Sequence, residues 1–455
     1  MRTWNKSRPG RPVFQHLAAL FIAAVFFVSP LRAQDPPPAA TALSLSTAVE
    51  YAIKNNVQTL IAGQQVLESE GTRGIVRSAL LPNIAASSYQ ANITSNLAAT
   101  GLPVQDMNSF PIFVGPFSRF DARLSAVQSI FDLGAIRRYQ ASNKGVDLAK
   151  ERQQLAVQQV TTTSILSYLA VLETEASLAA ARSNAQLAEK LLELAISQKN
   201  AGVATGVDVA RAQTRAANQR VQLAQAEVSL SRARLNLLRV VGLPLSTNVA
   251  LADQMRFGPE SVPDIKLAID KALVDRVEIK MADKAVQIAE MQHKAAVAGR
   301  LPAVSAFGDY GSSGLKPNEI NLPTRSIGIQ LNLPVFDGGR IRSEAKIAMS
   351  RLQQTQMQRT DLLAEVEKEV RLALMIMKTR EEQVKASIQT ETLAARELEL
   401  AQDRFKNGAG DNIEVINAQT ALEDARQTYV LSLAQFTAAR VSLFVAMGHP
   451  EDFRF

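Results

Sequence analysis

Cysteine is absent from the 455-residue sequence, and histidine and tryptophan are scarce. The missing cysteine excludes disulfides, thiol catalysis, cysteine-ligated zinc and a lipid carried on an N-terminal cysteine. His16 lies in the leading segment, and His293 and His449 are far apart in the sequence, so we expect no metal site. Without clustered histidines or a recognisable catalytic triad, we also expect no cofactor and no enzymatic activity.

A strong excess of one charge is missing as well. The sequence has 50 basic and 43 acidic residues, and five of the basic residues lie in residues 1–33, which contain no acid. Beyond that segment, 45 basic residues stand against 43 acidic ones. This balance does not support a nucleic-acid-binding surface, so we expect no nucleic-acid partner.

Residues 1–33 have the pattern of a secretory signal peptide. Basic residues precede an apolar run from Leu17 to Val28, and small residues near Ala33 offer a cleavage region. The alternative is an uncleaved membrane anchor, but a run of 12 residues falls short of the roughly 20 that a spanning helix needs. We therefore expect export through a cleaved signal peptide, and no membrane attachment through helices.

Proline is absent from four long windows, which are rich in Ala, Leu, Gln, Glu, Lys and Arg: Leu43–Leu81, Ala135–Gly242, Ile265–Leu301 and Arg340–Gly448. Because proline breaks helix interiors and these residues favour helices, each window predicts long helices. A helix over Ala135–Lys199 would be about 95 Å long at 1.5 Å per residue, and Arg340–Lys406 is similar. Helices of this length predict a projecting bundle.

Four landmarks recur in the same order, which indicates an internal duplication. They are Leu-Pro at 81–82 and 301–302, Phe-Asp at 131–132 and 336–337, a Gly…Ala-Gln-Thr segment at 202–214 and 408–420, and Gly-x-Pro at 242–244 and 448–450. We predict a first copy over 34–250, a linker over 251–264, a second copy over 265–448 and a tail over 449–455. Two copies are too few for a solenoid.

Each copy contains two segments in which apolar and polar residues alternate. We predict strands at about 84–96 and 118–131 in the first copy, and at about 303–312 and 325–335 in the second. Their length suits tilted transmembrane strands, and the alternative is two soluble hairpins with one wet face. Four strands cannot close a barrel, and a membrane tolerates no open edge. Strands that span a membrane would therefore require several chains to share one barrel.

The signal peptide, the duplicated helix–hairpin–helix units and the paired landmarks together resemble the TolC-type outer-membrane efflux proteins, from about Leu43 to Pro450. The resemblance implies a mainly α fold with β-barrel strands. Four strands per protomer would complete a 12-stranded barrel in a homotrimer, and the barrel would continue into a periplasmic tube of helical rods. Two rods of each protomer would be single long helices. The others would be stacked pairs: Leu43–Leu81 with Ile413–Met447, and Val207–Val241 with Ile265–Leu301.

The resemblance also implies a function without chemistry. Such a protein is an exit duct in the cell outer membrane that extends into the periplasm and opens at its periplasmic helix tips. Its partners would be outer-membrane lipid, a periplasmic adaptor (membrane fusion) protein and an inner-membrane pump of RND or ABC type. Two alternatives stay open: a type I protein secretion duct, and a non-conducting envelope scaffold of long helices.

The helix tips are the first candidate site. They should be the turns Asn200–Val207 and Asn407–Ile413, and they contain these glycines and polar residues: Gly202, Gly206, Asp208, Gly408, Gly410, Asp411, Glu414 and Asn417. By resemblance, three copies of Glu414 would form a cation-favouring carboxylate ring, and Asn417 stands where some relatives carry a second acid.

The alternative for these acids is helix capping, because Thr205-x-x-Asp208 and Asp411-x-x-Glu414 both resemble capping boxes. The family often places an arginine latch shortly after the tip glycine. This sequence has Gly410 at that position, and Lys406 could substitute only weakly.

The second candidate site is the interior of the barrel. Arg119, Asp121 and Arg123 alternate toward one face of their strand. We expect them to line the lumen, and the alternative is a solvated strand face.

Overall fold

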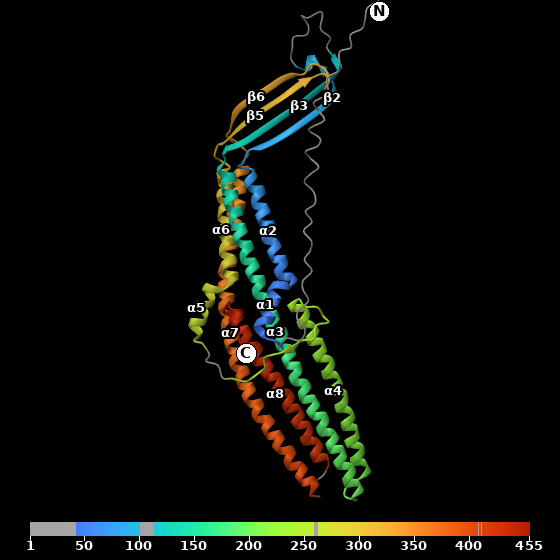
Figure 1. Ribbon diagram of the computed structural model, residues 1–455. Coiled ribbons are helices and arrows are strands. Elements are labelled where there is room, and N and C mark those ends of the chain that lie inside the picture. The colour runs from blue at the N-terminus through green and yellow to red at the C-terminus, as the bar shows by residue number, and fades with distance from the viewer. Residues whose placement is uncertain (1–41, 101–112, 259–262, 408, 411) are drawn as a thin grey trace, which may run out of the picture. The chain divides into compact units, whose positions relative to one another are not determined.

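The computed structural model describes residues 42–100, 113–258, 263–407, 409–410 and 412–455. The expected signal peptide lies outside the described residues. The described part of the chain forms one unit in which long helices continue from a small sheet (Figure 1).

The helices repeat in two sets. They are α1 (Leu45–Asn55), α2 (Val57–Ser78), α3 (Leu133–Asn200) and α4 (Gly206–Val241), then α5 (Ile265–Asp275), α6 (Val277–Ala298), α7 (Arg340–Lys406) and α8 (Asn412–Ala446). The long helices α3 and α7 have 68 and 67 residues. The short helices match in length, with 11 residues in α1 and α5 and 22 in α2 and α6. The equal lengths of helices at equivalent positions show that the two copies of the repeat have the same helical structure.

Besides the expected tip turns, a break divides each of the windows Leu43–Leu81 and Ile265–Leu301, which corrects the expectation of continuous helices there. Asn56 separates α1 from α2 with ψ 134°, and Arg276 separates α5 from α6 with ψ 127°. An extended residue cannot continue a helix. Side-chain contacts hold both residues: Asn56 donates to the Val240 carbonyl (2.8 Å), and Arg276 binds Glu278 and Glu369.

The expectation of which helices stack end to end was also wrong. The end of α4 meets the α1–α2 junction, where Gly242 lies against Asn55. The end of α8 meets the α5–α6 junction, where Gly448 lies against Arg276 and His449 Nε2 lies 2.8 Å from Asp275 Oδ2. Each stacked pair therefore belongs to one copy of the repeat. Because equivalent helices have equal lengths, summed lengths could not distinguish the two pairings.

The sheet is antiparallel with the order β2-β3-β5-β6. Its strands are β2 (Asn83–Asn96), β3 (Phe113–Phe131), β5 (Ala303–Gly314) and β6 (Leu322–Asn332). β3 begins five residues before the expected 118, and β6 ends at 332 rather than 335. Pro334, which has no N–H to donate to a ladder, lies two residues beyond the end of β6. A two-residue parallel pair joins β1 (Ala42–Leu43) to β4 (Ala250–Leu251).

The core is a set of seams between helices rather than a central globule. Around Tyr168 of α3, one cluster brings together residues of α1, α4, α8 and the C-terminal tail. Near the tip of α7 and α8, small and apolar side chains interlock, among them Ala401, Phe405 and Ala418. By length and composition α3 and α8 could cross a membrane, but 44% and 50% of their most apolar windows are buried against neighbouring helices.

Candidate functional site

The first helix tip is a capped turn. The α3 helix ends at Asn200 and α4 begins at Gly206, with Gly202 at φ +75° between them. The Asp208 carboxylate accepts from the Thr205 N–H (2.8 Å), and the Thr205 hydroxyl accepts from the Asp208 N–H (3.3 Å). Hydrogen bonds from Thr205 lower the pKa of Asp208. The structure therefore gives Asp208 the capping geometry that the sequence offered as an alternative.

The second tip carries an ion pair that sequence reasoning missed. Arg404 Nη1 lies 3.5 Å from Glu414 Oε1, so the end of α7 is joined to the first turn of α8. The expected substitute, Lys406, instead lies 3.8 Å from Asp403. A Cβ on Gly410 would lie 3.1 Å from the Arg404 Cβ, so this position favours glycine. Asn417 is exposed, and Gly408 and Asp411 lie outside the described residues.

The two tips touch each other. Asn412 Nδ2 donates to the Asp208 carbonyl (3.2 Å), and Gln198 Nε2 donates to the Phe405 carbonyl (3.2 Å). Between the tips lies a hollow of about 540 Å³, lined in part by Arg404 and Glu414. Both expected turns therefore meet at one end of the bundle.

Farther from the tips, a second ion pair links α4 to α8. The guanidinium of Arg215 contacts the carboxylate of Glu423, which also accepts from Gln219 Nε2 (2.9 Å) and Gln419 Nε2 (3.0 Å). Burial raises the pKa of Glu423, although Arg215 opposes the shift. Arg215 and Glu423 are 208 residues apart, close to the repeat offset. The repeat offset is the sequence signal that could have predicted that these two residues lie at the same height along the bundle.

The polar face of the sheet is a network of ion pairs. Asp121 is 1% exposed and accepts from Arg123 Nε (2.6 Å) and from the Ser313 hydroxyl (2.7 Å). Arg123 Nη1 also lies 3.1 Å from Asp309 of β5. Strand register places the exposed Arg119 on the same face. The structure thus brings together the three residues that the alternation singled out.

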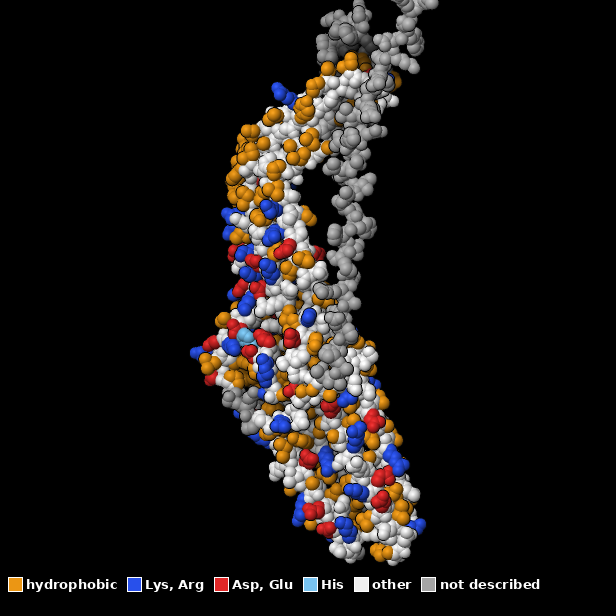
Figure 2. All heavy atoms as spheres, in the orientation of Figure 1, with side chains coloured by type: hydrophobic (Ala, Val, Ile, Leu, Met, Phe, Trp, Pro, Cys, Tyr) orange, Lys and Arg blue, Asp and Glu red, His pale blue; other side chains and the backbone are white. Residues whose placement is uncertain are grey.

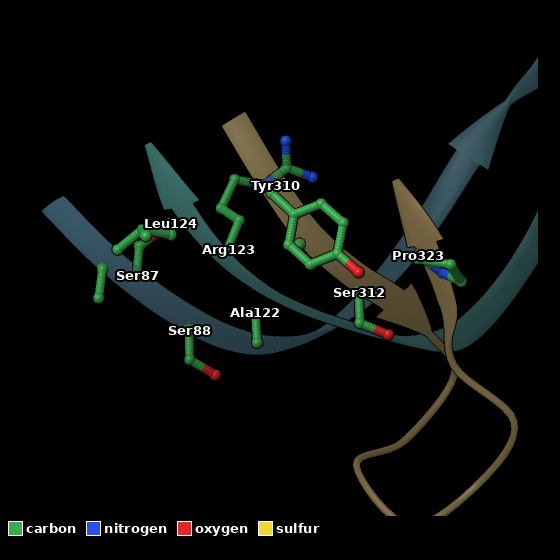
Figure 3. Close-up of a pocket in the computed structure, with 10 residues that line it drawn as sticks. Ser87, Ser88, Ala122, Arg123, Leu124, Tyr310, Ser312 and Pro323 are labelled. Atoms are coloured by element: carbon green, nitrogen blue, oxygen red, sulfur yellow. The ribbon is translucent and has the colours of Figure 1, made fainter. Parts of the chain in front are cut away.

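The opposite face of the sheet is apolar and exposed. Tyr310 is 65% exposed, Ile327 86% and Ile329 73%, and hydrophobic side chains cover much of this region (Figure 2). A shallow hollow of about 620 Å³ lies across the strands. Figure 3 shows Ser88, Ala122 and Ser312 there, which the register aligns in one row. One face of the sheet therefore carries the paired charges, and the other is largely apolar, with Arg325 opposite Tyr310.

Neither site has the constellation of a metal centre. Among the described residues, no group of three or more His, Asp or Glu side chains is placed to hold a metal ion. The charged groups at the tips and on the sheet instead pair with one another. Such pairs can hold helices together or line an aqueous path.

Comparison with known proteins identifies what the chain is similar to. A family model described as outer membrane efflux protein matches residues 48–243 and 268–449. The alkaline protease secretion protein AprF of Pseudomonas aeruginosa is 24% identical over 394 residues, which cover 85% of this chain and 80% of AprF. The pyoverdine export outer membrane protein OpmQ of Pseudomonas putida is 25% identical over 415 residues, covering 89% and 85%.

Solved structures share the fold. The Campylobacter jejuni CmeC outer membrane channel superposes with a TM-score of 0.77 at 17% identity, covering 98% of this chain and 94% of CmeC. The outer membrane protein VceC of Vibrio cholerae gives 0.74 at 17% identity, covering 89% and 96%. These likenesses confirm the expected fold class, long helices joined to barrel strands.

Proposed function

The chain belongs to the outer membrane efflux protein family, and from this premise we propose how its residues form a duct. Membership confirms the expected outer-membrane location and a transport role without chemistry. We propose that three copies assemble into one barrel and one periplasmic tube. The tube would receive substrates from a periplasmic adaptor protein and an inner-membrane pump of RND or ABC type.

The two-faced sheet is the observation that carries this proposal. Its apolar face is exposed in one chain, as a lipid-facing surface requires, while its other face carries Arg119, Asp121 and Arg123. In the described sheet, β2 and β6 are the edge strands. A membrane does not tolerate an open strand edge, and four strands are too few to close on themselves. Three copies joined edge to edge would supply twelve strands, with the charged face toward the lumen.

At the other end, the tips would form the periplasmic gate. Near the tips, the α7–α8 hairpin has its own apolar seam, and Leu187, Leu191 and Leu194 of α3 pack against it. Polar contacts of Asn412 and Gln198 also join the two hairpins. We propose that opening separates the hairpins along this shared face and leaves each hairpin intact. Glu414 from three copies would then surround the aperture and favour cations when its carboxylate is released from Arg404.

For the transported substrate, we propose only a class of compound. AprF is named for protease secretion and OpmQ for pyoverdine export, so the family members similar to this chain differ in what they pass. We propose efflux of small toxic compounds, with type I protein secretion as the alternative. The third possibility, a scaffold without a pore, disagrees with the efflux role by which the family is described.

Gene deletion tests this function. The deletion strain should become more sensitive to some of a panel of detergents, dyes, antibiotics and metal salts, and the wild-type gene should restore resistance. Planar-bilayer conductance of the purified protein, with a chemically cross-linked sample to count subunits, tests the duct itself. Unchanged sensitivity together with a changed secreted-protein profile would favour secretion, and a protein that never conducts would contradict the duct.

A further inference from the structure

The helix segments next to the sheet hold an unusual concentration of basic residues. Segments 71–81, 132–143, 291–301 and 337–347 contain nine Lys and Arg residues and three acids. We call the nine the basic collar: Arg73, Arg77, Arg137, Arg138, Lys294, Arg300, Arg340, Arg342 and Lys346. The chain beyond residue 33 has only two more basic than acidic residues (45 against 43). The basic excess is therefore local to the collar.

The three acids of these segments are already engaged. Asp132 accepts from the Ala135 N–H (2.8 Å) and Asp337 from the Ile341 N–H (2.7 Å), so each holds a helix start. Glu344 lies 2.8 Å from Arg340. Arg77, Arg300 and Arg342 are exposed, and no acid lies within ion-pair distance of them in the part of the chain that the structure describes.

Helix stabilisation accounts for Arg77 in the last turn of α2 and for Arg300 just after α6, where a helix end favours cations. It does not account for the basic residues at the starts of α3 and α7. The first turn of a helix favours acids, because its free N–H groups carry partial positive charge. Yet neither α3 nor α7 has an acid in its first turn, and α7 begins Arg340-Ile-Arg342. Even the Arg340–Glu344 pair runs in the less favourable direction along the helix. These positive charges suit a negative partner outside the chain.

The collar borders the apolar face of the sheet. Between sheet and helices lie exposed apolar residues, among them Phe131 (43% exposed), Val335 (90%) and Phe336 (91%). Figure 2 shows hydrophobic side chains over the sheet and Lys and Arg side chains where the helices begin. An apolar band followed by basic residues is the order found where a protein leaves a membrane with anionic headgroups.

We propose that the basic collar binds the phosphate groups of anionic phospholipids at the membrane face from which the helices emerge. Arg77, Arg300 and Arg342 contact the phosphates, while Val335 and Phe336 enter the boundary of the acyl chains. This inference rests on the proposed barrel, because only a membrane-embedded sheet brings the collar to a lipid surface. The preference for anionic lipid is a property beyond the duct itself.

Lipid competition on the full-length protein tests the proposal. The protein is reconstituted into phosphatidylcholine vesicles with and without phosphatidylglycerol, extracted in mild detergent, and the retained lipids are measured by native mass spectrometry. Wild type should retain phosphatidylglycerol preferentially. In the variant R77Q/R300Q/R342Q, the ratio of retained phosphatidylglycerol to phosphatidylcholine should fall about fivefold for each charge removed. This is the effect of one basic residue beside an anionic surface.

Two matched variants make the result specific. K190Q/R232Q/R239Q removes three basic charges from α3 and α4 away from the collar and should keep the preference. R77K/R300K/R342K keeps the positive charges and should keep it too. Equal retention of both lipids by wild type, or an equal loss in the K190Q/R232Q/R239Q variant, would overturn the collar inference while leaving the duct intact. Failure of wild type to enter either vesicle would contradict the proposed barrel.

Discussion

Gly448, at the end of α8, lies directly against Arg276, the residue that separates α5 from α6. A Cβ built on Gly448 would lie 3.2 Å from the Arg276 Cα, and Gly448 has φ +88°. The first copy repeats the arrangement: Gly242 has φ +75°, and a Cβ there would lie 2.7 Å from the Asn55 Cβ. Each stacked pair of short helices is thus joined where only glycine fits.

Substituting these glycines should loosen the joints. Gly448→Ala and Gly242→Ala each place a side chain in a left-handed conformation and against a neighbouring helix. We expect a loss of about 1–3 kcal/mol in the free energy of unfolding, the usual range for such strain. Chemical denaturation monitored by circular dichroism measures it. The control is Gly145→Ala in α3, where a Cβ meets nothing within 4 Å; it should stabilise by up to about 1 kcal/mol. Equal effects at all three positions would contradict the joint.

The capping carboxylate of Asp208 should make the first tip sensitive to acid. Its hydrogen bonds from Thr205 lower its pKa below the ordinary 3.8, so the folded state favours the ionised form. The stabilisation is therefore complete well above pH 3.8 and is lost as the pH falls through the lower folded-state value. Asp208→Asn should cost about 0.5 kcal/mol at neutral pH, and wild type and variant should converge below pH 3.8. A constant difference in unfolding midpoint across this range would show that the charge is irrelevant.

The Arg215–Glu423 pair should hold the proposed gate closed. Removing either partner leaves the other charge half-buried and unpaired, so Arg215→Gln and Glu423→Gln should each raise the open fraction in planar-bilayer recordings. The charge reversal R215E/E423R should restore much of the closed state. A reversal that is leakier than either single variant would argue against a specific pair.

An exposed pair supplies the control for the gate. Arg220 and Glu189 lie 2.7 Å apart, but Arg220 is 69% exposed and both residues belong to the α3–α4 hairpin. Exposed pairs contribute about 0–1 kcal/mol. Arg220→Gln should therefore leave conductance unchanged.

An added charge should be harmful on one face of the sheet and tolerated on the other. Ile329 lies on the apolar face of β6, and Gln330, the next residue, lies on the polar face. Ile329→Lys should cost about 2–4 kcal/mol of stability in the bilayer, the cost of a charge on a lipid-facing strand, and should reduce the yield of the proposed trimer in chemical cross-linking. Gln330→Lys should insert like wild type. Equal trimer yields from both variants would contradict a lipid-facing Ile329.

Features that depend on neighbouring residues in the sequence were predictable. The proline-free windows predicted where the long helices run, because a missing N–H or a proline ring acts on its own turn. Alternation at Ile327, Ile329 and Leu331 predicted a strand there, because the side chains of a strand alternate between its two faces. The tip turns followed from their glycines, and α3 and α7 end within one residue of the predicted turn starts.

Features that depend on distant contacts were not predictable in this way. Asn56 is a local signal, because asparagine favours helix starts and its side chain caps α2, but its contact with Val240 is not local. Nothing local breaks the helix at Arg276, which has no capping hydrogen bond and contacts Glu369. The choice of Arg404 over Lys406 as the partner of Glu414 depends on how α7 and α8 meet.

The sequence by itself determined the repeated order of helices and strands, because periodicity, proline and glycine act within a few residues. Only the tertiary structure decided which helix ends stack and which charges pair. Helices of equal length and repeats with one offset allow several arrangements, and packing of side chains hundreds of residues apart selects one of them. Gly448 against Arg276 and Arg215 against Glu423 are the contacts in which that selection is visible.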